Sequence, residues 1–309
     1  MLTTKASSQI RVYYELTKPK IWYLLVFTAF GSALTASNIY NVEISPATWV
    51  LMLGGVAAGS AAANTLTNYH DRDIDAIMER TKDRPIPSRR IFPAEKARDF
   101  GLVLSAISLV AAFGISYTTT LEQGLWALGF MAFGLLNNVV IYSYTLKRHS
   151  RTNIILGGLC GGAPPMIGYV AVTMQGLWEI GLVMAGLVFI WIPMHIWALT
   201  LHFKEDYNKV NVPMLTAVQS EKTSARVIAG STVMMVLFSI VPFFLTSDTG
   251  QPIMHEVYLY TAIATGILMV ALSAWVVVKP TEKASWTLFK FSSPYLAILF
   301  IALMIDSAL

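Results

Sequence analysis

Long apolar stretches alternate with short polar segments along the chain. Each stretch approaches the roughly 20 residues that a helix needs to cross a membrane. We therefore predict an all-helical polytopic membrane protein. The pattern indicates nine membrane-spanning helices, at residues 20–37, 47–68, 100–118, 124–144, 154–173, 178–201, 225–246, 256–278 and 287–306.

The composition supports this prediction and limits the number of domains. The chain is 55% hydrophobic and 13% charged, with a mean hydropathy of +0.58. A water-facing surface needs far more charge, so an ordinary soluble domain is excluded. The longest interruption between spans is residues 69–99, and we expect one membrane-embedded domain over residues 1–309.

The basic residues predict how the chain crosses the membrane. All 22 Lys and Arg residues lie in the N-terminal segment or in alternate loops. The remaining loops contain none, although acids such as Glu43, Glu122 and Asp248 occur there. Because basic loops stay on the cytoplasmic side, we expect a cytoplasmic N-terminus and an outer C-terminus. The first apolar segment is long for a signal sequence and no clear cleavage site follows it, so we expect that it is not a cleaved signal. The basic loops are 69–99, 144–153, 202–226 and 279–290.

Polar residues after the second predicted span form a candidate binding site. On a helix, Asn64, Asn68, Asp71 and Asp75 share one narrow stripe, whereas Asp73 points the opposite way. Carboxylate and carboxamide oxygens suit Mg²⁺, which prefers a partly filled protein shell completed by phosphate oxygens. A solvated helix end paired with arginines is the alternative. A binding role is favoured because the stripe begins within the membrane, where unpaired polar groups are costly.

Basic residues flank these acids on the same predicted membrane face. Arg72, Arg80 and Arg84 follow the acids, and Lys147 and Arg148 lie in the next inner loop. Acids and bases together indicate a site for a metal-bridged diphosphate. For Lys147 and Arg148 alone, membrane topology is an equally good explanation. Topology also accounts for the net charge of +4, so no nucleic-acid partner is expected.

A second polar cluster follows the sixth predicted span. Asp206 is a candidate for a second oxygen site, although the cluster is weak as a metal motif. His195 lies within the span, where an ionisable group is a functional candidate, and imidazole is a ligand for heme iron. A neutral histidine hydrogen-bonded inside the bundle is the alternative for His195. Cys160 has no partner for a disulfide, and we expect it to be a packing residue.

Several strings resemble a known family. Asn68, Asp71 and Asp75 match the N-x-x-D-x-x-x-D signature of the UbiA-type superfamily of intramembrane prenyltransferases. Other strings in the sequence are similar to the protoheme IX farnesyltransferase (heme O synthase) branch of this superfamily. These are "LTKPKI" at 16–21, "NYHDRDIDAIMERTKDRPIPS" at 68–88, "GGAPPMIGY" at 161–169, "MHIWAL" at 194–199 and "DYNKVNVPML" at 206–215.

The resemblance implies a fold and a reaction. Members of this branch have nine helices around a central cavity open to the cytoplasm. They transfer a farnesyl group from farnesyl diphosphate to a vinyl group of heme B (protoheme IX), giving heme O. The implied setting is the plasma membrane, where terminal-oxidase assembly proteins receive the product. The inner segments 69–99, 144–153 and 202–224 are expected to cap the active site.

The resemblance also implies roles for individual residues. Mg²⁺ is the expected cofactor, and Asn68, Asp71 and Asp75 are the expected catalytic residues. Because the superfamily's second acidic signature is reduced here to Asp206, a second metal is not implied. Expected metal ligands are Asn68, Asp71, Asp75 and Asp206. Expected diphosphate contacts are Arg72, Arg80, Arg84, Lys147, Arg148 and Lys204, and expected heme contacts are His195 and Trp197.

Two alternatives stay open from the sequence. Within the superfamily, the acceptor could be a quinone precursor or a lipid glycerol. Outside it, a transporter or channel also places acids and histidines in a membrane. Transporters commonly hold such groups near the midplane, whereas here they lie at the inner ends of the predicted helices.

Overall fold

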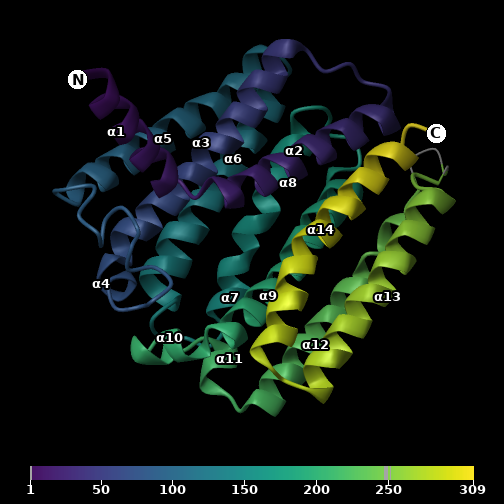
Figure 1. The fold of residues 1–309 in the computed structure, drawn as a ribbon. Coiled ribbons are helices and arrows are strands. Elements are labelled where there is room, and N and C mark those ends of the chain that lie inside the picture. Colours follow the sequence, from purple (N-terminus) through teal and green to yellow (C-terminus); the bar gives the residue numbers. More distant parts are fainter. Residues whose placement is uncertain (1, 247–249, 251) are drawn as a thin grey trace.

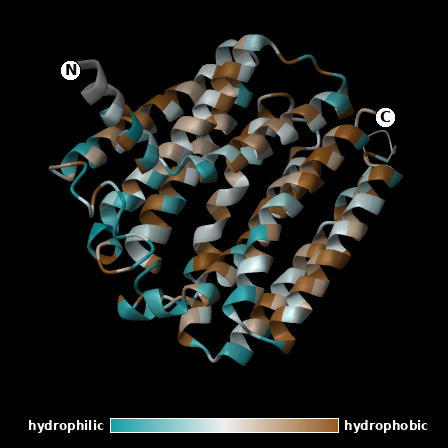
Figure 2. Cartoon of the chain, in the orientation of Figure 1, coloured by the Kyte–Doolittle hydropathy of each residue, from teal (hydrophilic) through white to brown (hydrophobic). Residues whose placement is uncertain are grey.

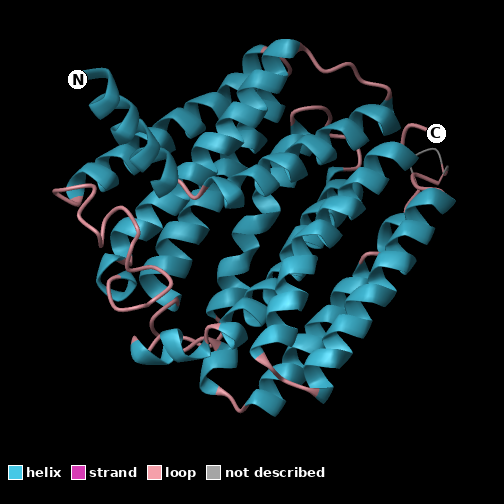
Figure 3. Cartoon of the chain, in the orientation of Figure 1, coloured by secondary structure: helices cyan, strands magenta, loops and turns pink. Residues whose placement is uncertain are grey.

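The fold is a bundle of long helices, seen in a computed structural model that describes residues 2–246, 250 and 252–309 (Figure 1). These residues contain helices and one isolated bridge between Thr246 and Pro252, and no strand is found among them (Figure 3). Asp248, one of the acids expected on the outer side, lies outside the described residues.

Eight helical segments of the described chain are long and apolar enough to cross a membrane. They agree closely with eight of the nine predicted spans. In two of them an α-helix joins a π-helical segment, and in two others a short 3-10 segment follows. The elements are α2 (Pro19–Tyr40), α3 (Pro46–His70), α5 (Glu95–Gly114) with η1 (Ile115–Tyr117), α6 (Leu121–Leu136) with η2 (Asn137–Leu146), η4 (Leu177–Gly181) with α9 (Leu182–His202), α12 (Glu221–Phe238) with η5 (Val241–Phe244), α13 (Glu256–Val278) and α14 (Glu282–Asp306).

The fifth predicted span, 154–173, is a chain of three short helices instead of one long helix. They are α7 (Asn153–Gly157), η3 (Gly158–Gly162) and α8 (Ala163–Val170). Every residue of α8 is buried. A Cβ at Gly168 would lie 2.1 Å from the carbonyl oxygen of Ala29, so this glycine permits close contact with α2. The count of nine spans stays a prediction.

Four shorter helices complete the described chain: α1 (Leu2–Leu16), α4 (Arg72–Asp75), α10 (Lys204–Lys209) and α11 (Leu215–Val218). Hydrophilic residues gather around α4 and α10, whereas hydrophobic residues follow the long helices (Figure 2). Large apolar side chains such as Val110, Leu237 and Ile267 are exposed on these helices. An apolar outer surface of this kind fits contact with lipid.

A buried carboxylate joins the two last helices at the end of the bundle away from α4 and α10 (Figure 1). Asp306 ends α14, is fully buried, and accepts the backbone N–H groups of His255 and Tyr258. These N–H groups lie at the start of α13, where a helix has no backbone acceptors of its own. His255 supplies no side-chain cap. Asp306 therefore caps a neighbouring helix.

Asp306→Ala should destabilise the folded protein. The substitution leaves two N–H groups without their acceptor, and each lost contact of this kind costs about 1–3 kcal/mol. Thermal unfolding of the detergent-solubilised protein would measure the effect. Glu256→Gln is the control, because Glu256 is exposed in the same helical turn. Equal unfolding temperatures for the two variants would contradict the capping role.

Candidate active site

The residues of the predicted row lie together at the end of α3, although the helix that carries them is interrupted. Helix α3 ends at His70, and Asp71 connects it to α4. Backbone hydrogen bonds from Asp71 to Thr67 and from Asp75 to Asp71 continue the helical path. Asn68, Asp71 and Asp75 are only 3%, 1% and 3% exposed. The three side chains therefore share one buried location.

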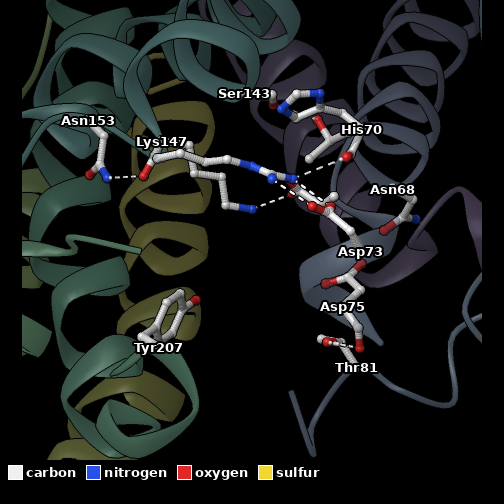
Figure 4. A network of polar contacts seen from close by, with 12 residues as sticks. Asn68, His70, Asp73, Asp75, Thr81, Ser143, Lys147, Asn153 and Tyr207 are labelled. Atoms are coloured by element: carbon white, nitrogen blue, oxygen red, sulfur yellow. Dashed lines mark hydrogen bonds and ion pairs between the residues drawn. The ribbon is translucent and has the colours of Figure 1, made fainter. Parts of the chain in front are cut away.

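Two cations from other segments face this row. Arg84 Nη1 lies 2.7 Å from Asp75 Oδ2 and 3.4 Å from Asn68 Oδ1. Lys147 forms an ion pair with Asp71 Oδ2 and reaches the acids from another helix (Figure 4). Since one Arg84 nitrogen contacts oxygens of both Asn68 and Asp75, these oxygens are close enough to share a single positive group.

Local backbone structure positions Lys147. The preceding segment, η2, is π-helical, and the Lys147 N–H bonds the Tyr142 carbonyl at 2.8 Å. Such wide turns occur frequently at functional sites. Asn153 Nδ2 also donates to the Lys147 carbonyl at 3.2 Å. Both contacts hold the backbone from which the lysine side chain extends.

Asp73 points away from the row, as its helical position predicts. Its side chain is 61% exposed and pairs with Arg148, with both Nη–Oδ distances at 2.7 Å. Hydrogen bonding to Arg148 lowers the pKa of Asp73 to about 2. Arg148 Nη2 also lies 3.9 Å from Asp71 Oδ1. Asp73 therefore orients Arg148 beside the buried row.

Sequence reasoning missed Lys18, which borders the site. Asn68 Nδ2 donates to the Leu16 carbonyl at 2.8 Å and so holds the chain just before α2. Lys18 has a φ of 53° directly before a proline, where this left-handed conformation is disfavoured. Burial lowers its pKa well below the usual value, and the charge of Arg84 lowers it further. The signal in the sequence was a basic residue within "LTKPKI".

Four buried polar atoms here have no hydrogen-bond partner. They are His70 Nε2, Asp71 Oδ1, Arg148 Nε and Asn153 Oδ1. Protein interiors rarely leave such atoms unsatisfied, and exceptions often mark binding or catalytic sites. These four atoms are therefore available to form hydrogen bonds with a polar ligand.

The oxygen atoms of the row fit Mg²⁺. Asp71 Oδ1 accepts no hydrogen bond, and the oxygens of Asn68 and Asp75 already share a cationic neighbour. No cluster of three His, Cys, Asp or Glu side chains suitable for a metal occurs in the described chain. Two carboxylates and one carboxamide instead form an incomplete shell, which suits an ion that retains phosphate or water ligands.

Asp206 occupies a separate position in the structure. Its carboxylate accepts the backbone N–H of Arg80 at 3.1 Å and lies 3.4 Å from Lys209 Nζ. Burial acts to raise its pKa, but hydrogen bonds to backbone N–H groups outweigh burial, so the pKa lies below its usual value. In the part of the chain that the structure describes, no hydrogen bond or ion pair joins Asp206 to the row. Asp206 holds the segment after α4 against α10.

Three of the basic residues expected at the site have other partners. Arg72 is exposed and stacks 4.4 Å from the Tyr69 ring centre. Arg80 lies over the Phe203 ring, and Lys204 donates to the Gln219 carbonyl at 2.6 Å. Among the described contacts, none of these three side chains bonds an acid of the row.

His195 lies in an aromatic stack between α9 and α14. Its ring is stacked between Trp191 and Phe289, at centroid distances of 4.1 and 4.4 Å. Its Nδ1 lies 2.6 Å from Ser292 Oγ. This packing agrees with a hydrogen-bonded histidine inside the bundle. Trp197 is 5% exposed, and its Nε1 is buried without a hydrogen-bond partner.

A mostly apolar pocket of about 90 Å³ lies between α2, α3, α6 and α8. Asn64, one helical turn from Asn68, lines this pocket. Ile21, which follows the Lys18 turn, lines it as well. The arrangement suits a ligand with a charged head and an apolar tail.

Comparison with known proteins identifies similar sequences along nearly the whole chain. The profile of the UbiA prenyltransferase family matches residues 24–302. The chain is 69% identical over 309 residues to protoheme IX farnesyltransferase 2 of Cenarchaeum symbiosum (strain A), covering 100% of this chain and 99% of that protein. Identity to protoheme IX farnesyltransferase of Thermoplasma volcanium is 40% over 302 residues, covering 96% and 98%.

Solved structures share the fold at low sequence identity. A structure of digeranylgeranylglyceryl phosphate synthase matches with a TM-score of 0.74 and 20% identity, covering 97% of this chain and 99% of that one. A UbiA homologue from Archaeoglobus fulgidus, bound to GPP and Mg²⁺, matches with a TM-score of 0.57 and 14% identity, covering 95% and 99%. At these identities the likeness concerns the fold alone.

Lys18→Gln should weaken the binding of inorganic diphosphate in the presence of Mg²⁺ by about tenfold. Loss of one charge-assisted hydrogen bond, worth about 1.5–3 kcal/mol, accounts for a change of this size. Isothermal titration calorimetry on the solubilised protein would measure it. Lys20→Gln is the matched control, because Lys20 is exposed two positions along the chain. Equal diphosphate affinities for the two variants would show that Lys18 does not contribute to diphosphate binding.

Proposed function

The chain belongs to the UbiA prenyltransferase family, and we propose that it transfers a farnesyl group from farnesyl diphosphate to a vinyl group of protoheme IX. The product is heme O. One observation carries this proposal: a buried row of carboxylate and carboxamide groups faces two cations, and a mostly apolar pocket begins one helical turn away at Asn64. This arrangement complements an allylic diphosphate, which has an anionic head and an apolar tail.

Asn68, Asp71 and Asp75 would hold Mg²⁺ bound to the diphosphate. When bound, the ion supplies positive charge that stabilises the departing diphosphate. Without substrate, the acids are neutralised by Arg84 and Lys147. With substrate, these two side chains would turn to phosphate oxygens, while the acids face the metal. The exchange keeps every buried charge compensated, because an unpaired buried charge is strongly unfavourable.

Cations of the chain would assist cleavage of the allylic C–O bond. Arg84, Lys147 and Arg148 lie beside the acids, where negative charge would develop on the leaving diphosphate. Preorganised charges at that position lower the barrier without reorganising during the reaction. Arg72, Arg80 and Lys204 were expected to share this role and stay predictions. In this structure they bind other groups.

The reaction balances without a protein nucleophile. The C–O bond breaks, and its electron pair leaves with diphosphate. The vinyl π electrons form the new C–C bond, water adds to the resulting cation, and a proton is released. Apolar side chains around the pocket would exclude water from the farnesyl cation until the C–C bond has formed.

The acceptor would bind against α9, with His195 and Trp197 as proposed heme contacts. The His195 ring is stacked between two other aromatic rings, so the edge of the ring would contact the acceptor. The Trp197 Nε1 has no hydrogen-bond partner and is available as a donor.

Asp206 would act by holding the segment after α4, since it binds the Arg80 N–H. In this proposal residues 69–99, 144–153 and 202–224 cap a site that opens to the cytoplasm, with the C-terminus outside the plasma membrane. Terminal-oxidase assembly proteins would receive the product.

Asp71→Ala and Asp75→Ala should each lower turnover by at least about a hundredfold, because loss of one preorganised electrostatic contact commonly has an effect of this size. The assay measures prenylated heme by mass spectrometry after incubation with farnesyl diphosphate, protoheme and Mg²⁺. Asp73→Ala is the control, since its side chain is 61% exposed, and it should retain most activity. Wild-type activity in Asp71→Ala would refute the assigned row.

Removal of divalent metal should abolish product formation, and added Mg²⁺ should restore it. The row has too few protein ligands to hold Mg²⁺ without phosphate oxygens or water, so chelation should strip the site readily. Heme extracted before and after treatment with EDTA would be compared by mass. Full activity after exhaustive chelation would contradict a metal-dependent leaving group. A prenylated quinone or lipid without prenylated heme would identify a different acceptor.

A further inference from the structure

Arg84, which faces the acids of the row, extends from a segment of irregular backbone. Residues 76–94 form turns and bends between α4 and α5. Pro85 and Pro87 follow Arg84 closely, and neither has a backbone N–H to donate. A continuous helix cannot form over these residues, so the position of the Arg84 backbone depends partly on contacts from side chains.

Arg90 holds the peptide groups on both sides of the Arg84 α-carbon. Its Nη2 donates to the Asp83 carbonyl at 2.6 Å, which belongs to the peptide group preceding Arg84. Its Nε donates to Ser88 Oγ at 3.1 Å, and Ser88 Oγ donates to the Arg84 carbonyl at 2.6 Å. One guanidinium group thus restrains the backbone from which the Arg84 side chain extends.

Glu15 of α1 fixes the Arg90 guanidinium in turn. Its Oε2 and Oε1 accept hydrogen bonds from Arg90 Nη1 and Nη2 at 2.5 and 2.6 Å. Such two-point pairing adds geometric specificity to the attraction of charges. Hydrogen bonding to Arg90 also lowers the pKa of Glu15, so the carboxylate stays ionised at neutral pH. An isolated exposed ion pair contributes little, but this pair belongs to a network that ends at Arg84.

Apolar contacts keep the end of α1 against this irregular segment. Leu16 is fully buried and forms a cluster with Ile86 and Ile91, among others. The Leu16 carbonyl accepts a hydrogen bond from Asn68 Nδ2 at 2.8 Å. The end of α1 is therefore connected to the row in two ways, through Asn68 and through the Glu15 carboxylate.

We propose that Glu15 and Arg90 are positioning residues that hold Arg84 for binding of the diphosphate group. This inference rests on the proposed function and extends it to two residues that do not touch the diphosphate themselves. In the resting protein Arg84 pairs with Asp75, and on binding its side chain would turn to a phosphate oxygen. A backbone that is already fixed limits this exchange to the side chain, so less conformational freedom is lost on binding.

Isothermal titration calorimetry of the solubilised full chain with inorganic diphosphate and Mg²⁺ tests this role. Arg90→Ala should weaken diphosphate binding by about tenfold, because residues in one hydrogen-bond network are coupled by about this amount. Arg98→Ala is the matched control, since Arg98 is also an exposed arginine paired with an acid, Asp99, at 2.8 Å. Equal diphosphate affinities for these two variants overturn the proposal.

A double-mutant cycle separates positioning of Arg84 from a general effect on the fold. Binding stays measurable in Arg84→Gln because Lys147 and Arg148 still lie beside the acids. In this background Arg90→Ala should cause little further loss of affinity, since the residue on which Arg90 acts is already replaced. Additive losses from the two substitutions overturn the proposal, and so does an unchanged affinity in Arg84→Gln.

Glu15→Gln is a second variant that keeps the size of the side chain. It removes the charge that orients Arg90 and should weaken diphosphate binding by about threefold, the size expected for one exposed charged pair. The unfolding temperature should stay close to that of the wild type, because Glu15 is 46% exposed. A lower unfolding temperature without a change in diphosphate affinity would show a purely structural ion pair and contradict the positioning role.

The calorimetry contains no heme, so it separates failure of this inference from failure of the proposed function. Diphosphate binding that is weakened by Arg90→Ala and not by Arg98→Ala, without prenylated heme from the wild type, would refute the proposed acceptor and leave the positioning role supported. Prenylated heme from the wild type, with equal diphosphate affinities in the two variants, would overturn the inference and leave the proposed reaction standing.

Discussion

Compensation of buried charge is the constraint on which the structure of this site depends. Asp71 and Asp75 are almost fully buried at the end of a lipid-embedded bundle, where an unpaired carboxylate is strongly unfavourable. Lys147 and Arg84 neutralise them from segments far away in the sequence. A metal-bound anion could replace these pairs without leaving a charge exposed to the apolar interior. In the proposed reaction, the same pairing that stabilises the resting protein would prepare it for a charged ligand.

The turn before α2 connects this charged site to the apolar pocket. Asn68 uses its amide nitrogen to hold the Leu16 carbonyl, which leaves its oxygen facing Arg84. The left-handed Lys18 then redirects the chain into α2, whose residue Ile21 lines the pocket. One short segment therefore supplies a backbone anchor, a partly buried lysine and an apolar side chain of the pocket. Disfavoured backbone conformations persist where the surrounding contacts determine them.

Helix irregularities also shape the bundle. The π-helical turns of η2 precede Lys147, and the break after α3 places Asp71 between two helices. The glycine-rich fifth segment packs as short helices against α2 and α9, and its last helix, α8, is fully buried. In a membrane, irregular backbone is tolerated where it is buried in protein or lines a cavity. These departures from regular helix lie around the site and the apolar pocket, where both conditions hold.

The sequence by itself determined the long apolar helices, because the number of consecutive apolar residues is enough to predict a membrane span. Helical periodicity also placed Asn68, Asp71 and Asp75 together, since neighbours on one helix face need no long-range contact. Only the tertiary structure decided which cations meet them. Arg84 reaches the row whereas Arg72 turns to Tyr69, and these contacts depend on how distant segments fold back. The apolar pocket likewise arises from packing between helices, which no local pattern encodes.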